Sequence, residues 1–437
     1  MAKAPVTEVI ICFIFISTAS VIYFINKLIV NFELFGDVQP GYSWIVHCIT
    51  NVLGYLTILL PVYFIYKYIN KINYVDKPGS GRFAVLLRRF YGEDESLDKS
   101  GTVNKDTAPR TALNEALLLT FYFAGLQISF LSWGVLQEKI MTQKYLSIDN
   151  EEGHFKDSQF LVFVNRILAF CTSGFYIFCK RQPRHKCPYY KYIFCSLSNI
   201  MSSWCQYEAL KYVSFLHQVL AKAAKTIPVI IMGKIVSRIK YEYYEYVTAG
   251  ILSIGMLFFL LDAGDNKSTS TITTFSGLFL LCSYIVFDSF TSNWQGALFT
   301  QFGMSPVQMM CTVNFFSCIF TATSLLQQDG FSSSINFMIK YPAFTVDCIL
   351  LSICSAGGQL FIFNTLSTFG PLVFAIISTI RQGFSVLLSC IIYQHHVGFA
   401  GVCGILLVFC SIFLRLYCSY RVKALRKSTK IINDMKV

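Results

Sequence analysis

The sequence predicts an all-α polytopic membrane protein: a ten-helix core of two inverted five-helix repeats, with two N-terminal transmembrane helices in front. Three observations lead to this fold class. Hydrophobic residues make up 54% of the chain and charged residues only 14%, and many apolar runs reach the roughly 20 residues that a membrane-spanning helix needs. Basic residues gather in loops that fall on one side of these runs. A cation recurs in the middle of corresponding runs in the two halves.

The first two apolar runs, 8–30 and 44–68, are expected to form an N-terminal pair of spans within residues 1–70. No small-residue cleavage site clearly follows the first run, so we expect a retained span rather than a signal peptide. Residues 71–111 mix basic and acidic side chains and are expected to form a cytosolic linker.

Ten further runs are expected to form the core, with one repeat in 112–261, a second in 275–418 and a basic cytosolic tail over 419–437. The expected core spans are 112–136, 159–179, 190–211, 214–234, 244–261, 275–297, 306–326, 344–366, 371–393 and 398–418. Twelve spans place both termini on one side, together with the basic loops. The positive-inside rule makes this side cytosolic.

The stretch 214–236 is apolar enough to lie in a membrane, yet Lys222 and Lys225 occur near its middle. A lysine at mid-bilayer costs about 2.5 to 3.5 kcal/mol on insertion scales, and such residues usually face a cavity and suggest an anionic ligand. On a helix, Gln218, Lys222 and Lys225 fall on one face. The alternative is a pair of lysines that snorkel to a helix end.

A second stretch, 369–394, carries Arg381 near the middle of another apolar run. Aligned without gaps, Lys225 matches Arg381 and Leu210 matches Leu366. These cations fall on the fourth and ninth core spans, so each half has five spans, and an odd number makes the halves insert in opposite directions. Inverted repeats of this kind build secondary transporters with a binding site near the midplane.

Several core spans carry polar residues at helical spacing. The stripes are Gln127 with Gly134; Asn199, Ser203 and Gln206; Asp288, Ser292 and Gln295; Asn314, Ser317 and Thr321; and Ser352, Ser355 and Gln359. Each stripe alone is also consistent with hydrogen bonding between helices. Together with the cations they favour a polar central cavity, in which Tyr207 and Phe315 are candidates for stacking on a base.

The residue pattern favours recognition without catalysis, with no cofactor and no metal site. The six histidines show no metal-ligand spacing, and neither a Gly-rich phosphate loop nor a nucleophile elbow occurs. The 16 cysteines lie mainly inside spans, so no disulfide framework is expected. The net charge of +12 comes from loops that orient the spans, so no nucleic-acid partner is expected. A membrane-embedded transferase remains as a less favoured alternative.

Seven segments of the core carry a resemblance to a known family. They are GLQISFLSWGVLQEKIMTQKY (125–145), QYEALKYVSF (206–215), QVLAKAAKTIPVIIMGKIVS (218–237), FDSFTSNWQGALF (287–299), QMMCTVNFFSC (308–318), SICSAGGQLFIF (352–363) and STIRQ (378–382). On these segments the chain resembles the nucleotide-sugar transporter family of the drug/metabolite transporter superfamily, and within it the Golgi carriers of 3′-phosphoadenosine 5′-phosphosulfate (PAPS). The resemblance implies antiport of PAPS from cytosol to Golgi lumen for sulfation, in exchange for an adenosine nucleotide, 3′-phosphoadenosine 5′-phosphate (PAP) or AMP.

The resemblance also implies roles for particular residues. Lys222 and Lys225 correspond to the family's fourth-span lysines. Arg381-Gln382 corresponds to its ninth-span cationic motif, and Asn314 to a base-reading motif. With neighbouring polar candidates, the expected substrate-binding residues are Lys222, Lys225, Arg381, Gln382, Asn314, Gln218, Tyr207 and Gln359. The family pattern Phe-Pro-Thr-Gln is replaced here by Phe215-Leu216-His217-Gln218. A nucleotide-sugar antiporter of the same fold remains an alternative, and a homo-oligomer stays open.

Overall fold

The computed structural model describes residues 4–31, 43–72, 82–91, 112–147, 151–155, 157–180, 182, 187–213, 218, 225–236, 238, 241–265, 275–392 and 398–434. The helices are α1 (Ala4–Asn31), α2 (Ser43–Lys71), α3 (Arg82–Tyr91), α4 (Ala112–Thr142), α5 (Ser158–Cys179), α6 (Tyr190–Ala209), α8 (Thr226–Val236), α9 (Tyr243–Asp265), α10 (Phe275–Phe302), α11 (Pro306–Gln327), α12 (Gly330–Lys340), α13 (Pro342–Ile392) and α14 (Phe399–Asp434). The strands β1 (Tyr145–Leu146) and β2 (Glu152–Gly153) form a short antiparallel hairpin.

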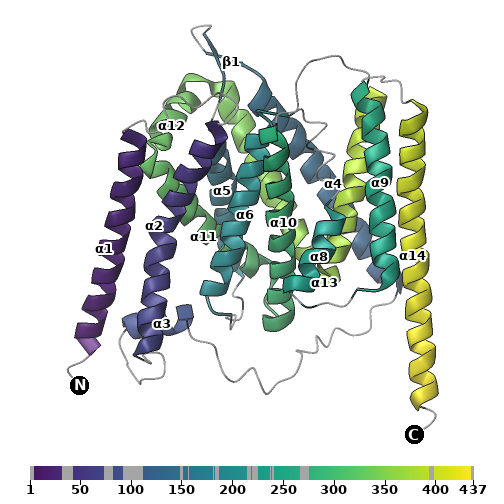
Figure 1. The fold of residues 1–437 in the computed structure, drawn as a ribbon, viewed down its shortest axis with the longest axis horizontal. Coiled ribbons are helices and arrows are strands. Elements are labelled where there is room, and N and C mark those ends of the chain that lie inside the picture. Colours follow the sequence, from purple (N-terminus) through teal and green to yellow (C-terminus); the bar gives the residue numbers. More distant parts are fainter. Residues whose placement is uncertain are drawn as a thin grey trace.

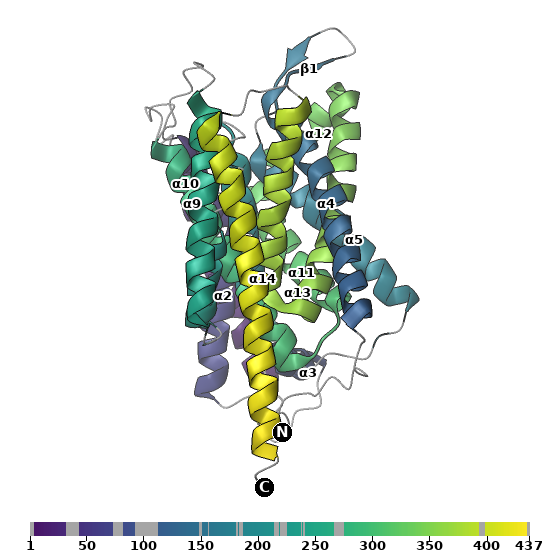
Figure 2. The ribbon, with the colours of Figure 1, turned by 90° about the vertical axis from the view of Figure 1, so that its right-hand side faces the viewer.

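Long helices stand side by side across the whole molecule (Figures 1 and 2), which confirms the predicted all-α polytopic class. Within the described residues, seven helices are long and apolar enough to cross a membrane. The other predicted spans fall on α6, α8, α9, the second part of α13 and α14. The start of α1 and the end of α14 lie at the end of the bundle that holds α3, and the β1–β2 hairpin lies at the opposite end (Figure 1).

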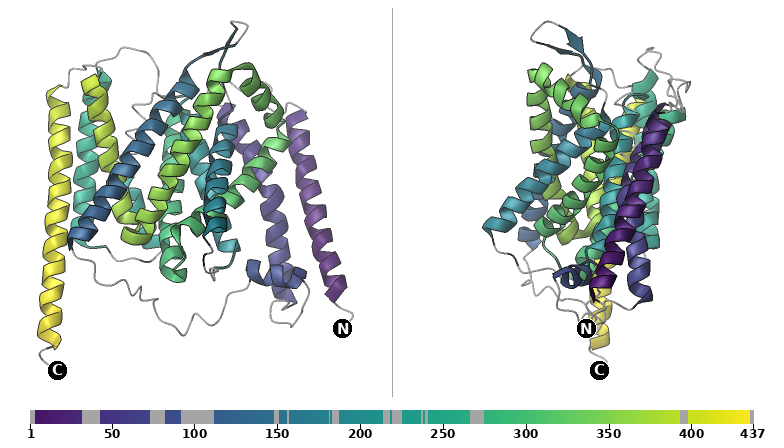
Figure 3. Two further views of the ribbon diagram at one scale, coloured as in Figure 1. Left: turned by 180° about the vertical axis from the view of Figure 1, so that it is seen from behind. Right: turned by 90° about the vertical axis from the view of Figure 1, so that its left-hand side faces the viewer.

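Helix packing in the core follows the predicted inverted repeats. Helix α4 packs on α13 and α6 packs on α10, while α5 packs on α11 and α9 on α14. If each span of the first repeat is exchanged with the corresponding span of the second, the α4–α13 contact becomes the α6–α10 contact. The same exchange leaves the α5–α11 and α9–α14 contacts unchanged. The α4–α13 contact is close, because a Cβ on Gly125 would stand 2.3 Å from the ring of Phe361. Figure 3 shows the same arrangement from behind and from the side.

Two helices of the core break where the sequence predicts cationic spans. Helix α13 contains the predicted spans 344–366 and 371–393, joined at Gly370, whose φ of 82° and ψ of 172° are not helical. Only glycine readily adopts this conformation, and Pro371 is suited to the first turn of the helix that follows. Lys225 lies in a turn directly before α8, and its carbonyl accepts the first hydrogen bond, from the Val229 amide at 3.1 Å.

Lys225 therefore lies at the start of a helix, and the prediction of one helix running through it is corrected. Gln218 has helical conformation, whereas Lys222 and the Leu216-His217 departure lie outside the described residues.

The predicted linker and tail contain helix that the hydropathy pattern did not indicate. Helix α3 falls within 71–111 and buries Leu87 and Tyr91 one turn apart, and the Tyr91 hydroxyl donates to the Val62 carbonyl at 2.9 Å. Helix α14 continues through the predicted tail to Asp434. These segments are too short or too polar to span a membrane, so a search for apolar runs passes over them.

The front pair of helices docks on the core through polar contacts. Helix α2 packs on α11, where the Ser324 hydroxyl donates to Asn51 Oδ1 at 2.8 Å. Gln159 of α5 donates to the Tyr55 hydroxyl at 2.7 Å. Gly54 permits the close approach, because a Cβ there would stand 2.7 Å from the Ser324 Cα. Small residues and interhelical hydrogen bonds are the usual means of helix association in lipid.

Candidate functional site

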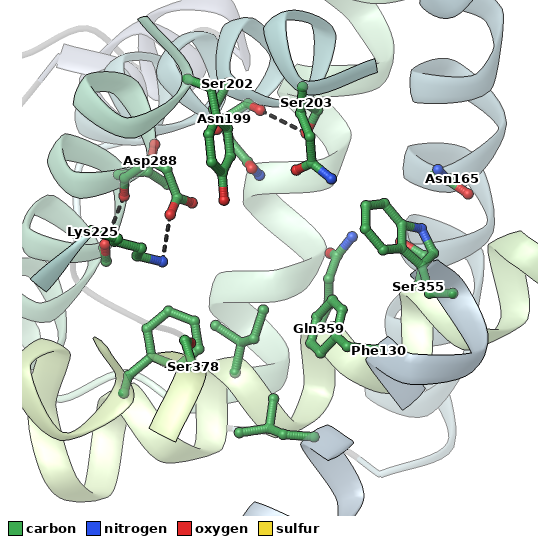
Figure 4. Close-up of a pocket in the computed structure, with 18 of the residues that line it drawn as sticks. Phe130, Asn165, Asn199, Ser202, Ser203, Lys225, Asp288, Ser355, Gln359 and Ser378 are labelled. Carbon is green, nitrogen blue, oxygen red and sulfur yellow. Dashed lines mark hydrogen bonds and ion pairs between the residues drawn. The ribbon is translucent and has the colours of Figure 1, made fainter. Parts of the chain in front are cut away.

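A cavity of about 150 Å³ lies inside the core, with walls from α4, α5, α6, α10 and both parts of α13 (Figure 4). Its lining residues are Leu126, Phe130, Trp133, Val162, Asn165, Arg166, Asn199, Ser202, Ser203, Gln206, Tyr207, Lys225, Tyr284, Asp288, Thr291, Ser292, Gln295, Ser355, Gln359, Ile362, Phe363, Phe374, Ile377, Ser378 and Arg381. Both halves of the core contribute, as expected of a site between inverted repeats.

Lys225 is buried in one wall of this cavity, with 4% of its surface exposed. Its ammonium group forms an ion pair with the carboxylate of Asp288 on α10 and lies 4.7 Å from the ring centroid of Phe374 on α13. Figure 4 shows the lysine and the aspartate facing each other across the cavity edge. A carboxylate and an aromatic face both stabilise a desolvated ammonium group.

Arg381 lines the same cavity from the second part of α13, and its guanidinium carbon lies 5.2 Å from the ring centroid of Phe130 on α4. The two cations that the sequence matches between its halves thus come together at one site. Of the other predicted cationic-span residues, Lys222 and the side chain of Gln382 lie outside the described part of the chain.

Tyr207 and Gln359 also line the cavity. The Tyr207 hydroxyl accepts a hydrogen bond from Asn165 Nδ2 at 2.7 Å. Gln359 Oε1 accepts one from Asn314 Nδ2 at 2.8 Å, which fixes the orientation of the glutamine.

Asn314 and Gln218 lie one layer behind the cavity wall. Asn314 is fully buried, and its amide also donates to the Met310 carbonyl at 2.7 Å. Gln218 is fully buried and donates to the Gln206 carbonyl at 2.6 Å. In this conformation both residues support lining residues rather than reach the cavity themselves.

The polar stripes divide in the same way. Three supply lining residues, namely the stripes that contain Asn199, Asp288 and Ser355, whereas the stripe of Asn314 is buried behind the wall. Phe315, a candidate for stacking, is 43% exposed and packs on Phe170 instead of lining the cavity.

The aromatic residues that line the cavity are Phe130, Trp133, Tyr207, Tyr284, Phe363 and Phe374. Among 41 phenylalanines, hydropathy gives no means of telling which face inward.

Arg166 is a lining residue that the sequence reasoning missed. It projects from the middle of α5, is 7% exposed, and its Nη2 donates to Asn199 Oδ1 at 3.2 Å and to the Ser203 hydroxyl. The sequence feature that could have identified Arg166 is a single cation within the apolar run 159–179. An ionisable residue inside a span is by default a candidate functional residue.

A polar cluster joins α4, β1 and α13 at the hairpin end of the core. Lys139 of α4 forms a 2.7 Å ion pair with Asp347 of α13, and the Tyr145 hydroxyl of β1 donates to the same carboxylate at 2.9 Å. Burial, followed by the hydrogen bond to Asp347, raises the pKa of Tyr145, which therefore keeps its proton and remains a donor. Lys139 is about 9 Å along α4 from the lining residue Trp133 at 1.5 Å per residue.

The charges of the described lining residues are three cations, Arg166, Lys225 and Arg381, against one carboxylate, Asp288. Amide and hydroxyl groups and aromatic rings complete the lining. Such a site suits a ligand with several anionic groups and an aromatic ring. Within the described residues, no group of three or more His, Cys, Asp or Glu could hold a metal ion.

Comparison with known proteins gives concordant results. The model of the UAA transporter family matches residues 118–419. A Drosophila melanogaster protein named adenosine 3′-phospho 5′-phosphosulfate transporter 1 is 47% identical over 98% of this chain and 96% of its own length. The Homo sapiens protein of the same name is 48% identical over 87% of this chain and 88% of its own length.

More distant similarities agree with this grouping. An Arabidopsis thaliana protein named UDP-galactose/UDP-glucose transporter 5B is 37% identical over 68% of this chain and 86% of its own length. A solved crystal structure matches with a TM-score of 0.50 at 11% identity, covering 70% of this chain and 98% of that chain, which supports the fold alone. The predicted resemblance is confirmed, and the chain belongs to the UAA transporter family.

Proposed function

We propose that this protein is an antiporter that carries PAPS from the cytosol into the Golgi lumen, in exchange for PAP or AMP. The observation that carries the proposal is that Lys225 and Arg381, at matching positions of the two halves, line one cavity. The names of the near full-length relatives support PAPS as the substrate.

The cavity offers a physical route to recognition. Arg381 would present a planar fork to the phosphosulfate group and Lys225 a compact charge, while lining aromatic residues would stack on the adenine. Lys225 is already paired with Asp288 in this structure. An entering anion would therefore compete with that carboxylate, and Lys225 would pass from an internal to an external partner. We propose Lys222, Gln382, Gln218, Asn314, Tyr207 and Gln359 as the other members of the site, with Gln218 and Asn314 acting through lining residues.

The charge balance of the site supports exchange. Three cations against one carboxylate leave an excess of positive charge among the described lining residues. In a poorly solvated cavity this excess is costly, and an anionic ligand relieves it. The loaded carrier should therefore pass between its two mirror-related conformations more readily than the empty one.

Orientation is proposed from the placement of the chain ends. The start of α1, the end of α14 and the basic residues Arg88 and Arg89 of α3 share one end of the bundle. We assign this end to the cytosol by the positive-inside rule. The hairpin end, where Lys139 pairs with Asp347, is then luminal.

We propose the following units within this topology. They are a front pair over 1–70, a cytosolic linker over 71–111, repeats over 112–261 and 275–418, and a cytosolic tail over 419–437.

The test is uptake of labelled PAPS by the purified full chain in liposomes, either empty or preloaded with PAP or AMP. Preloading should raise the initial rate strongly, and equal rates with and without internal nucleotide would contradict exchange. UDP-galactose and UDP-glucose serve as competing substrates, because the Arabidopsis relative carries them by name. Uptake of these sugars in place of PAPS would favour the nucleotide-sugar alternative.

A further inference from the structure

Arg166 has a different environment from Lys225. Its hydrogen-bond acceptors Asn199 and Ser203 are neutral groups on α6. Its Nε is buried and has no hydrogen-bond partner among the described residues. No carboxylate of the described residues lies within ion-pair distance of Arg166, whereas Lys225 is paired with Asp288.

A purely structural role does not account for this arrangement. Neutral acceptors orient a guanidinium group but do not compensate its charge, and a buried charge without a counter-charge is strongly unfavourable. Arg166 lies near the middle of the membrane-spanning helix Ser158–Cys179, where this cost is highest. The group is held by α6 through its Nη2, and its Nε remains without an acceptor among the described residues.

The site of Arg166 differs from the site of Lys225. Arg166 comes from α5 and is held by α6, whereas Lys225 precedes α8 and contacts residues of α10 and α13. In Figure 4, Asn199 and Ser203, which hold Arg166, lie on a different part of the cavity wall from Lys225. A single ligand that satisfied both sites would need two anionic groups at different places on its skeleton.

We propose that Arg166 binds the 3′-phosphate of the substrate and so selects 3′-phosphorylated adenosine nucleotides over those without this group. The inference rests on the proposed function, in which Lys225 and Arg381 hold the phosphosulfate group on the 5′ side. A guanidinium group is suited to this task, because its planar fork matches phosphate and stays charged at all physiological pH values. A carrier for a nucleotide sugar has no 3′-phosphate to bind and needs no such residue.

The test compares PAP with AMP, which differ only by the 3′-phosphate, as inhibitors of labelled PAPS uptake into liposomes and as stabilisers of the purified protein against heat. Wild-type protein should prefer PAP. In Arg166→Gln the preference should fall by roughly tenfold to a hundredfold, the effect of one hydrogen bond to a charged group. The loss should appear in PAP binding, with AMP binding unchanged. Arg166→Lys keeps the charge without the fork and should lose part of the preference.

Two matched variants separate this role from a general loss of cations. Lys225→Gln should weaken PAP and AMP alike, because both carry the 5′-phosphate, and so preserve their ratio. Arg415→Gln removes another buried arginine, one on α14 that does not line the cavity, and should leave both affinities unchanged.

Equal weakening of PAP and AMP by the variants at Arg166, or no change in either, would overturn the assignment. If Arg166→Gln does not fold, Arg166→Lys decides by the same ratio. Wild-type protein that binds neither nucleotide would instead refute the proposed function itself.

Discussion

Replacing Asp288 by asparagine should tighten the binding of PAP while it slows exchange. In this structure the carboxylate neutralises Lys225, so an entering phosphate must take its place. Asp288→Asn removes this competitor and also its repulsion of the ligand. The direction is distinctive, since most substitutions in a binding site weaken binding.

The magnitude follows from the burial of the pair. The Lys225 side chain is 5% exposed and that of Asp288 is 27% exposed, so the pair lies between a surface ion pair and a fully buried one. Surface pairs contribute about 0.2 to 1 kcal/mol, and close interfacial pairs show couplings of about 1.5 kcal/mol or more. An intermediate value of about 1 to 2 kcal/mol corresponds to roughly fivefold to thirtyfold tighter binding of PAP.

The assay is thermal unfolding of the purified protein over a series of PAP concentrations, paired with PAPS/PAP exchange in liposomes. Without ligand, Asp288→Asn should unfold at a lower temperature than wild type, because Lys225 loses its counter-charge. The stabilisation by PAP should grow, and the exchange rate should fall as release slows. Asp288→Glu, which keeps the charge, is the matched control. Weaker or unchanged PAP binding in Asp288→Asn would show that the carboxylate is not a competitor of the ligand.

Four further outcomes are expected. Lys225→Ala and Arg381→Ala should each lose transport, by roughly thirtyfold to several thousandfold if 2 to 5 kcal/mol of binding is removed, and near wild-type uptake by both would contradict the site. Arg381→Lys should also lose substantial activity because the fork is absent, whereas full activity would mean that charge alone matters there. Gly370→Ala should destabilise the protein by about 1 to 3 kcal/mol, read as a lower melting temperature, because its conformation is strained for other residues while no atom lies within 4 Å of the added Cβ. Epitope tags at both termini should be accessible after selective permeabilisation of the plasma membrane, and protection of either tag would contradict the twelve-span topology.

Much of the fold could be predicted from the sequence, because membrane spans depend on a simple property, the length of an apolar run. The match between Lys225 and Arg381 likewise indicated the cavity and its position between the halves. Both features depend only on the order of residues along the chain, so a single sequence suffices to find them.

Properties that depend on the rotation of a helix or on its ends were not accessible in this way. Asn314 has the same polarity whether it faces the cavity or the layer behind it, and only helix packing decides between them. The start of α8 directly after Lys225 interrupts an apolar run without changing its hydropathy. Arg166 was visible as a single charge in a span, but its importance lies in the absence of a nearby carboxylate in the described structure, which only the three-dimensional arrangement reveals.

The docking of the front helices has a consequence for the energetics of the transport cycle. The core is built from two halves that can exchange roles, and an isolated core of this kind would have inward-facing and outward-facing states of similar energy. Helix α2 breaks that equivalence, because it forms hydrogen bonds at one edge of the core. Its Asn51 is bonded to Ser324 on α11, and its Tyr55 to Gln159 on α5. If these hydrogen bonds persist in only one of the two states, that state is lowered in energy, and the resting carrier favours one face of the membrane. The two faces would then show unequal apparent affinities for the same nucleotide. The equilibrium distribution of the exchanged nucleotides would still depend only on their concentrations on the two sides of the membrane.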